Sequence, residues 1–310
     1  MPITPSLYAD KILTNASVAY RNMNYIAEIL APVMLVDNRT GIYFVYDKSN
    51  LRVDNDVRTG KSNTPVVDFG MTKANFGPLT EHALKSGIEK DEMDEFQDPY
   101  DPKIDHTNTV TDRMLLNKEY ALATVMSSTS IVTQNVTLSG GSQWDDYANS
   151  TPIEDIKVAF NTVLQKGAMR PNTFACSWRV WTTLVNHPEI VDRIKYSQLG
   201  VTTEQLFAQI IGVKNVVIGD AVYNSANQGQ ADNLQYVWGL NAWLMFVPPK
   251  PALRSIAAFY TLVLKNGRYV DSWVEMDPKV TWVRVNDYYN QKLIAVESIY
   301  LINAACSSNA

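Results

Sequence analysis

The sequence WDDYANSTPIEDI (residues 144–156) opens the stretch that decides the fold, which continues as GAMRPNTFACSWRVWTTLVNHPEIVDRIKYSQL (167–199) and VTTEQLFAQIIGVKNVVIGDAVYN (201–224). Helix signals and strand signals alternate along it at short intervals. Such alternation indicates a sheet with helices packed on it. Because strand signals dominate the sequence that follows, the predicted fold class is α+β.

The first helix of this stretch has signals at both ends. Thr151 and Glu154 have the spacing of a capping box, and Pro152 suits the first helical position. Gly167 is the natural end of the helix. We therefore predict a helix over 152–167 with an apolar stripe made of Ile153, Ile156, Phe160, Val163 and Leu164.

Three shorter helices and two strands are predicted after it. The strands are expected over 173–176 and 213–219. The first helix is expected after Ser177, which would cap it, and the second is expected to start at Pro188. The third is expected after Thr202 as its cap and to end at Gly212.

The sequence before this stretch predicts extended segments. Residues 1–35 read either as an ordinary first helix or as an arm that buries its apolar residues on another subunit. Ile42–Tyr46 is a strand signal, and it resumes at Val66–Phe69 after a long polar excursion. Two strands with such an excursion between them predict a long hairpin.

Two short motifs near the hairpin tip resemble ligand sites but are incomplete. Gly60-Lys61-Ser62 ends like a phosphate-binding loop, yet Asn55 stands where the earlier glycine is required. Asp54-Asn55-Asp56 starts like a calcium loop, yet Thr59 stands where the sharp turn needs glycine. We interpret both as parts of a solvated tip.

A carboxylate-rich run over 89–105 precedes the longest predicted helix. Negative charge before a helix N-terminus offsets the helix dipole. Thr109 and Asp112 resemble a capping box, and the helix is expected to end in the Ser/Thr-rich stretch 127–133. Its predicted apolar face comprises Val110, Met114, Leu115, Ala121, Leu122, Val125 and Met126.

Strands dominate the C-terminal part. They are predicted over 234–239, 242–247, 256–265, 268–276, 279–286 and 292–303. Asn266-Gly267 is the strongest hairpin-turn signal, because both central positions of a type I′ turn need positive φ. A second turn is expected over 287–291. Four tryptophans in these strands are interpreted as core packing: Trp238, Trp243, Trp273 and Trp282.

Composition narrows the function classes. The chain has 310 residues, is 46% hydrophobic and carries a formal net charge of −5. An acidic balance argues against a dedicated nucleic-acid-binding protein, which needs concentrated Lys and Arg. No uncharged apolar run approaches the roughly 20 residues of a membrane helix, and the N-terminus lacks the pattern of a secretion signal. We expect a soluble intracellular protein without a membrane partner.

The sequence shows no complete catalytic motif. His82, His106 and His187 have no companion at ligand spacing, and Cys176 reads as a buried thiol. The carboxylates of Asp145 and Asp146 lie near a linker, and those of Glu154 and Asp155 lie in the first turn of a helix. Solvent exposure and helix capping explain them without a catalytic role. We predict no catalytic, cofactor-binding or metal-binding residue.

Several motifs of the central stretch carry a family resemblance. They are Trp144 with Ser150, Pro152 and Asp155-Ile156; Pro171-Asn172-Thr173; His187-Pro188-Glu189-Ile190; Asp192-Arg193-Ile194-Lys195; Leu206 to Gly212; Val216–Gly219; and Ala221, Tyr223 and Asn224. In order and spacing they resemble the tailed-bacteriophage major capsid protein family, in its branch with a short N-terminal arm. The likeness continues with fewer matching residues through Pro248-Pro249-Lys250-Pro251. The arm and hairpin match by arrangement only.

The resemblance implies the tailed-phage capsid fold. Its parts would be an N-terminal arm over 1–40, an extended β-hairpin loop over 41–90, and an axial α+β domain over 150–278. A peripheral domain would combine 91–149 with 279–310 and contain a spine helix over about 105–128. Some relatives join subunits by a Lys–Asn isopeptide bond, for which Lys61 is a candidate donor.

The resemblance also implies a function and partners. The chain would be the major capsid protein that self-assembles into hexamers and pentamers of an icosahedral shell around a double-stranded DNA genome. It would be no enzyme and need no cofactor. Its partners would be copies of itself, a separate scaffolding protein, a portal, an optional decoration protein and DNA bound without sequence specificity. Its location would be the virion, after assembly in the host bacterial cytoplasm.

Two alternatives stay open from the sequence. One is a cellular nanocompartment shell with the same fold, which encloses enzymes in place of a genome. The other is a soluble enzyme with a β-rich domain. Whether purified shells hold DNA or a cargo protein would distinguish the capsid from the nanocompartment. A monomer that turns over a small molecule would support the enzyme.

Overall fold

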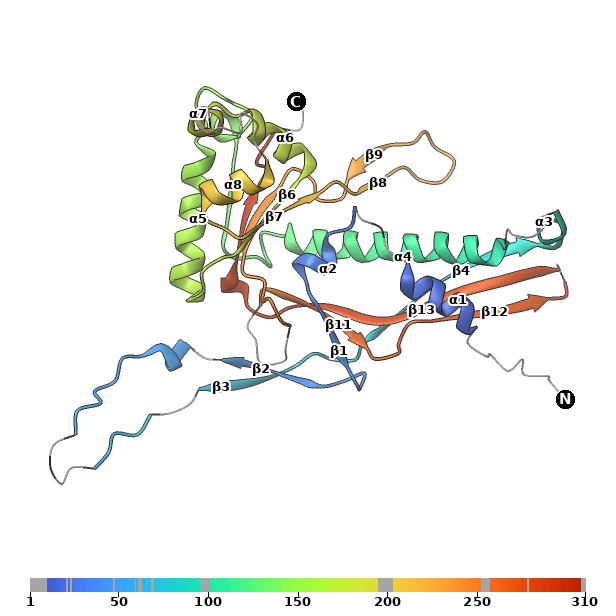
Figure 1. Cartoon of the computed structure of the whole chain (residues 1–310), viewed down its shortest axis with the longest axis horizontal. Coiled ribbons are helices and arrows are strands. Elements are labelled where there is room, and N and C mark those ends of the chain that lie inside the picture. The colour runs from blue at the N-terminus through green and yellow to red at the C-terminus, as the bar shows by residue number, and fades with distance from the viewer. Residues whose placement is uncertain are drawn as a thin grey trace.

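The computed structural model describes residues 10–307, apart from 21, 23, 47, 59, 61–62, 68–69, 96–100, 195–202, 252–256 and 278. Lys61 and Ser62 of the hairpin tip therefore lie outside the described residues. Figure 1 shows a long helix, α4, that connects a group of helices and strands at one end to long strands that run alongside it. A hairpin extends away from both groups.

Helix α4 runs from Pro102 to Met126, against a prediction of about 105–128. It starts earlier because the Asp101 carboxylate accepts a hydrogen bond from Lys103 N and because Pro102 occupies the first turn. The predicted capping box at Thr109 is wrong, since Thr109 lies inside the helix. The buried face also differs from the predicted one: Ala121 is exposed, while Lys118 and Glu119 are buried.

A five-stranded sheet lies alongside α4. Its order is β1 (Val33–Val36), β11 (Phe259–Leu264), β13 (Val280–Leu293) and β12 (Tyr269–Glu275), with β4 (Thr80–Glu89) also paired to β13. Helix α1 (Lys11–Ala19) and α4 cover one face of this sheet. The apolar cluster between them includes Leu13, Ile88, Val110, Val283 and Val285.

Two predicted turns in these strands are wrong. Asn266-Gly267 does not form a hairpin, because β11 and β12 do not pair with each other but both pair antiparallel with β13. From the pair Val263–Tyr289 to the pair Tyr269–Asn286, the chain that joins β11 to β12 advances six residues while β13 advances three. Residues 264–268 therefore form a bulge between β11 and β12, with Asn266 at φ 56°. The turn expected over 287–291 is continuous β13, which pairs with β4 up to Tyr289 and with β11 from Tyr289 onward.

The second sheet has helices on one face. Its order is β5 (Asn135–Thr137), β14 (Ile299–Asn303), β10 (Ala242–Met245), β6 (Thr173–Ser177) and β7 (Asn215–Gly219). Phe174, Cys176 and Leu244 pack against the helices on that face, and Ala175, Trp243 and Leu301 pack toward the α4 end on the other. The helices of the first face are α5 (Pro152–Gly167), α6 (Trp178–Asn186), α7 (Pro188–Ile194) and α8 (Glu204–Ile211).

The helix bounds here match the predictions closely, but two caps differ. The Thr151 side chain makes no cap hydrogen bond. The Glu189 carboxylate of α7 instead accepts from Ile153 N at 3.2 Å, so a neighbouring helix caps α5. Helix α8 is capped by Thr203, and Thr202 lies outside the described residues. Ser177 and Gly212 act as predicted.

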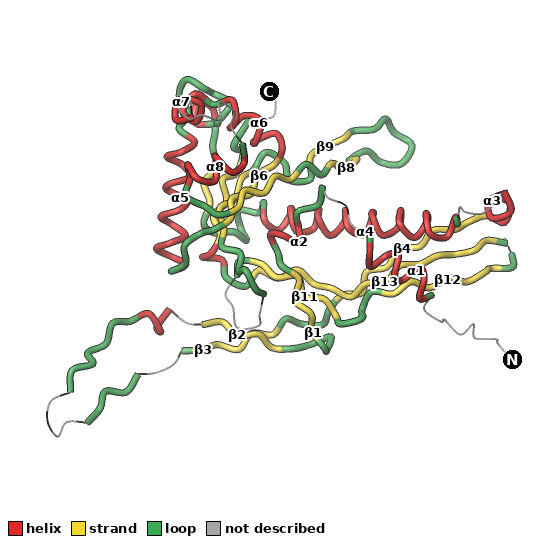
Figure 2. The backbone as a smooth tube through the Cα atoms, in the orientation of Figure 1, coloured by secondary structure: helices red, strands yellow, loops and turns green. Residues whose placement is uncertain are grey.

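The extended hairpin pairs β2 (Ile42–Tyr46) with β3 (Met71–Asn75) (Figure 2). The predicted second strand at Val66–Phe69 is wrong for its described residues, because Val66 and Val67 are loop. The 3₁₀ turn η1 (Lys48–Leu51) follows β2, and the rest of the described excursion has no regular structure. A separate short hairpin joins β8 (Val222–Asn224) to β9 (Leu234–Tyr236).

The remaining elements are short. They are α2 (Ala27–Leu30), α3 (Lys90–Glu95), η2 (Gly140–Ser142) and η3 (Val296–Ser298). The core assignment of the tryptophans is correct for Trp238 and Trp243, which are fully buried. It is wrong for Trp273 and Trp282, which pair across β12 and β13 and are partly exposed beside Lys85.

Candidate assembly surfaces

The three histidines have separate structural partners. His82 stacks on Tyr289 at 4.0 Å between ring centroids. His106 contacts the Ser86 hydroxyl at 2.8 Å and the Glu92 carboxylate at 3.1 Å. His187 precedes α7 and contacts the Ser150 hydroxyl. The fold therefore does not bring these side chains together.

His187 has a hydrogen-bond pattern that favours the neutral ring. Its Nδ1 accepts from Glu189 N at 3.2 Å, and its Nε2 lies 3.0 Å from the Ser150 hydroxyl. A second ring proton on Nδ1 would oppose the Glu189 N–H. Burial lowers the pKa of His187, and the Glu189 charge offsets only part of this shift.

The cysteines and the paired carboxylates also have structural surroundings. Cys176 and Cys306 are buried free thiols, and burial raises the pKa of both. Asp145 accepts from the Ser307 backbone N–H, and Asp155 accepts from Trp144 Nε1. Within the described ranges, no group of three or more His, Cys, Asp or Glu side chains is arranged to hold a metal ion.

The N-terminal segment lies along α4. The Ser17 and Thr111 hydroxyls are 2.9 Å apart, and Asn22 Nδ2 donates to Asp112 Oδ1 at 2.9 Å. Leu13 is buried in the cluster beneath α1, whereas Ile12 is 71% exposed. The segment therefore packs one side on its own chain and leaves apolar side chains such as Ile12 exposed on the other. Burial of these side chains on another subunit stays a prediction.

Glu119 of α4 is the buried attachment point of this segment. Its Oε1 accepts from Ile26 N at 2.9 Å and from Trp238 Nε1 at 2.7 Å, and its Oε2 accepts from Ala27 N at 2.7 Å. The carboxylate thus caps α2 and links it to the core. Burial raises the pKa of Glu119, while the N–H donors and Lys118 act in the opposite direction.

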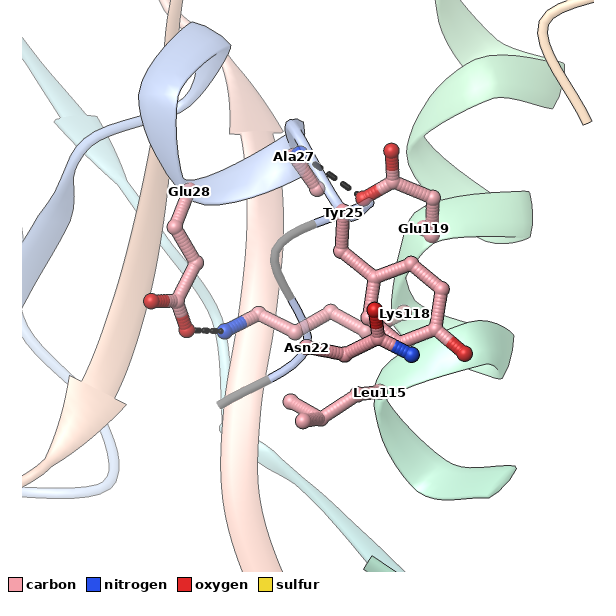
Figure 3. A pocket seen from close by; sticks show the side chains of 7 residues that line it. All are labelled: Asn22, Tyr25, Ala27, Glu28, Leu115, Lys118 and Glu119. Carbon is pink, nitrogen blue, oxygen red and sulfur yellow. Dashed lines mark hydrogen bonds and ion pairs between the residues drawn. The ribbon is translucent and has the colours of Figure 1, made fainter. Parts of the chain in front are cut away.

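Lys118 extends from the same turn of α4 (Figure 3). Its Nζ donates to Glu28 Oε1 at 2.7 Å and lies 5.4 Å from the Tyr289 ring centroid. Figure 3 shows Tyr25 and Asn22 beside these side chains, around a hollow of about 70 Å³. The hollow is small and holds a structural ion pair, so it offers no room for a substrate.

No sequence signal marked Glu119 or Lys118 as buried. Both lie within a helix whose charged residues are otherwise typical of a solvated face. A buried charge needs a partner from another segment. The partners of Lys118 and Glu119 are at least 90 positions away in the sequence. Only the fold reveals it.

The extended hairpin carries the most exposed apolar side chains. Val53 is 100% exposed and Val66 is 90% exposed, and Leu51, Val57 and Val67 are exposed as well. All five belong to the loop between β2 and β3, which extends away from the rest of the subunit (Figure 1). Exposed apolar side chains on a projecting loop are candidates for burial against another protein.

Within the described part of the chain, no helix has the length and apolar character needed to cross a bilayer.

Comparisons with known proteins agree with this arrangement. The major capsid protein of Burkholderia phage BcepMu is 27% identical over an aligned length of 303 residues, and the match covers 95% of each chain. A crystal structure of a phage-related protein from Bordetella bronchiseptica RB50 superposes with a TM-score of 0.76 at 24% identity, covering 97% of this chain and 98% of that one. The capsid structure of cyanophage P-SCSP1u superposes with a TM-score of 0.60 at 10% identity, covering 92% and 89%.

The solved structures show that the fold is the α+β fold of phage capsids. The sequence comparison goes further than the fold. The family model described as phage major capsid protein E matches residues 124–287, which is more than half of the chain. The chain therefore belongs to the phage major capsid protein E family.

Proposed function

We propose that this subunit forms the icosahedral head of a tailed bacteriophage and encloses its double-stranded DNA. Membership of the family makes the chain a structural capsid subunit of a virion that assembles with copies of itself. The observation that supports the fuller proposal is the set of bare apolar side chains on the β2–β3 loop and on α1.

On a lone subunit these side chains contribute little to stability, because they are exposed to water. Burial of apolar area against a neighbour contributes roughly 25 cal/mol per Å², before the cost of ordering the loop. A closed shell repeats each such contact in every copy, so modest contacts suffice. The long hairpin is then an intersubunit element.

The proposed partners follow from the container role. They are a separate scaffolding protein, a portal, an optional decoration protein and packaged DNA. The formal net charge of −5 suits DNA held without sequence-specific recognition, because a strongly basic wall would bind phosphates tightly. We place assembly in the host bacterial cytoplasm.

The proposed division of the subunit uses the strand pairing. The arm comprises 1–40 and the hairpin loop 41–90, except that β4 pairs with β13 in the peripheral sheet. We shorten the axial part from the expected 150–278 to 150–250 and assign β11 and β12 to the peripheral sheet with β13. β14 joins the axial sheet through β10. This revises the expected boundary near residue 279.

Electron microscopy of the expressed protein tests the proposal. Closed shells of uniform size are expected, and nuclease-protected DNA is expected in particles from infected cells. Particles that hold a cargo enzyme in place of DNA would support the nanocompartment alternative, which the family match favours less. A protein that stays a monomer under all assembly conditions would refute the proposal.

A further inference from the structure

The β8–β9 hairpin has one covered face and one bare face. On the covered face, Tyr223 packs on Tyr120 of α4 with ring centroids 4.9 Å apart. On the bare face, Val222 pairs opposite Tyr236, and Leu234 stands two residues before Tyr236. Side chains two apart on a strand share a face, and all three of these apolar side chains are exposed. The hairpin thus presents an apolar surface that its own subunit does not cover.

The hairpin is also acidic. Residues 220–236 contain Asp220 and Asp232 and no lysine or arginine. Both aspartates are exposed, and Asp232 accepts from Asn224 Nδ2 at 2.7 Å within the hairpin. A partner surface should therefore be apolar with a basic rim.

Such a surface lies between α5 and α8. Two adjoining hollows of about 350 and 630 Å³ share Arg170 and Gly212. Phe160, Ile210 and Ile211 line the first hollow, and Phe246 lines the second. These volumes fall in the range of roughly 300–1,000 Å³ that is typical of binding clefts. We call the two hollows together the α5–α8 groove.

The charges of the groove are complementary to those of the hairpin. Lys157, Arg170 and Lys214 line it, and no described lining residue is acidic. Lys157 has one exposed partner on the rim, Glu154, at 3.2 Å. In a chain whose net charge is −5, this local excess of cations is a distinct feature.

The two surfaces lie on opposite sides of the axial sheet. Phe160, Ile210 and Ile211 belong to the cluster on the helix-covered face, whereas Tyr223 at the base of the hairpin belongs to the cluster on the α4 face. Figure 1 shows α5 and α8 on one side of this part of the subunit and β8–β9 projecting from the other. A subunit therefore cannot fill its own groove with its own hairpin.

We propose that the β8–β9 hairpin of one subunit docks into the α5–α8 groove of the next copy around a capsomer ring. The contact joins two different surfaces, so it is heterologous, and a heterologous contact closes into a ring when its rotation divides a full turn. The apolar face of the hairpin supplies burial, and the opposed charges fix the register and disfavour other pairings. The inference rests on the proposed capsid function and adds a specific ring contact to it.

Charge reversal tests the pairing. The groove variant is Lys157→Glu with Arg170→Glu and Lys214→Glu, and the hairpin variant is Asp220→Lys with Asp232→Lys. Each alone should raise the protein concentration at half assembly by about tenfold or more, because like charges across the contact repel. The two sets combined in one chain should restore assembly to within about threefold of wild type, because opposite charges again face each other.

Two controls separate contact from folding. Asp232→Asn keeps the acceptor for Asn224 and only removes one charge, so it should weaken assembly less than the reversed hairpin variant does. Circular dichroism should show every variant folded. Normal assembly by either reversed variant alone would overturn the proposal. Loss in both that the combined chain does not restore would also overturn it, since the surfaces would then meet something else.

The wild-type chain distinguishes this inference from the proposed function. If wild type forms closed shells while the reversed variants behave like it, only the ring contact fails. If wild type forms no shells, the proposed function fails. Native mass spectrometry can then still test the contact, because it shows which variants form rings. Rings present in wild type and in the combined chain, but absent from both single-surface variants, would support the contact.

Discussion

Replacement of Glu119 by alanine should destabilise the subunit strongly. The side chain accepts three hydrogen bonds, from Ile26 N, Ala27 N and Trp238 Nε1, and it is fully buried. Alanine removes both acceptor oxygens, and with them all three hydrogen bonds. The donors stay buried, because Ile26 and Ala27 are less than 5% exposed and Trp238 is not exposed.

The magnitude follows from these three donors. A buried donor left without an acceptor costs roughly 1–3 kcal/mol. Water entering from the adjoining hollow can satisfy part of this loss. We therefore expect about 3–6 kcal/mol, which is a large share of the roughly 5–15 kcal/mol that keeps a domain folded.

Urea unfolding of unassembled subunits measures this effect. Glu119→Gln keeps one oxygen for Ile26 N and Trp238 Nε1 and faces Ala27 N with its amide, so a loss of about 1–2 kcal/mol is expected. The matched control is Asn117→Ala, an exposed position on the same helix, which should change stability by less than about 0.5 kcal/mol. Hydrogen exchange should show faster loss of the Ile26 and Ala27 amide protons in the alanine variant.

One result would refute the reasoning. If Glu119→Ala lies within about 1 kcal/mol of wild type, the carboxylate is not the attachment point of the N-terminal segment. Equal losses for the alanine and glutamine variants would show that its charge, and not its acceptor atoms, holds the segment.

Three further outcomes are expected. Burial lowers the pKa of His187 below its unfolded value of about 6.5, so the stability it contributes is present above that pH and is lost as the pH falls. His187→Asn keeps an acceptor for Glu189 N without titrating, so thermal unfolding between pH 7.5 and pH 5 should shift less in the variant than in wild type, and equal shifts would contradict this. Val53→Ser with Val66→Ser should leave urea unfolding of the subunit unchanged, since both side chains are bare, yet reduce shell yield by electron microscopy; normal yield would argue against the hairpin as a contact. Gly219→Ala should cost about 1–3 kcal/mol in urea unfolding because its methyl group would overlap the Trp238 ring, and a neutral result would mean that this ring can move.

The parts of the fold that the sequence predicted are those held by short-range interactions. The helix over 152–167 and the strand that begins at Thr173 were predicted with little error. Ser177 caps α6 by accepting from Val180 N, three residues away. Caps, apolar periodicity and stop glycines act within a few residues, so they are visible in a single sequence.

The candidate assembly surfaces were predicted only as an outline. The arm and the hairpin could be placed by their composition and by the family resemblance. The sequence did not show which of their apolar side chains stay bare, because Val66 and Leu13 look alike until the structure leaves one exposed and buries the other. The groove between α5 and α8 joins residues distant in sequence and had no signal.

By itself, then, the sequence determined the fold class, the capped helices of the central stretch and the family resemblance. Only the tertiary structure decided which strands pair with each other and which groups meet the buried carboxylate of Glu119. Asn266-Gly267 has the local preference for a hairpin, but long β13 pairs with the strands on both sides of it and makes it a bulge. Glu119 is buried because N–H donors from residues 26, 27 and 238 converge on it. Pairing and convergence depend on segments far apart in the chain, so their free energy cannot be assigned to any local pattern.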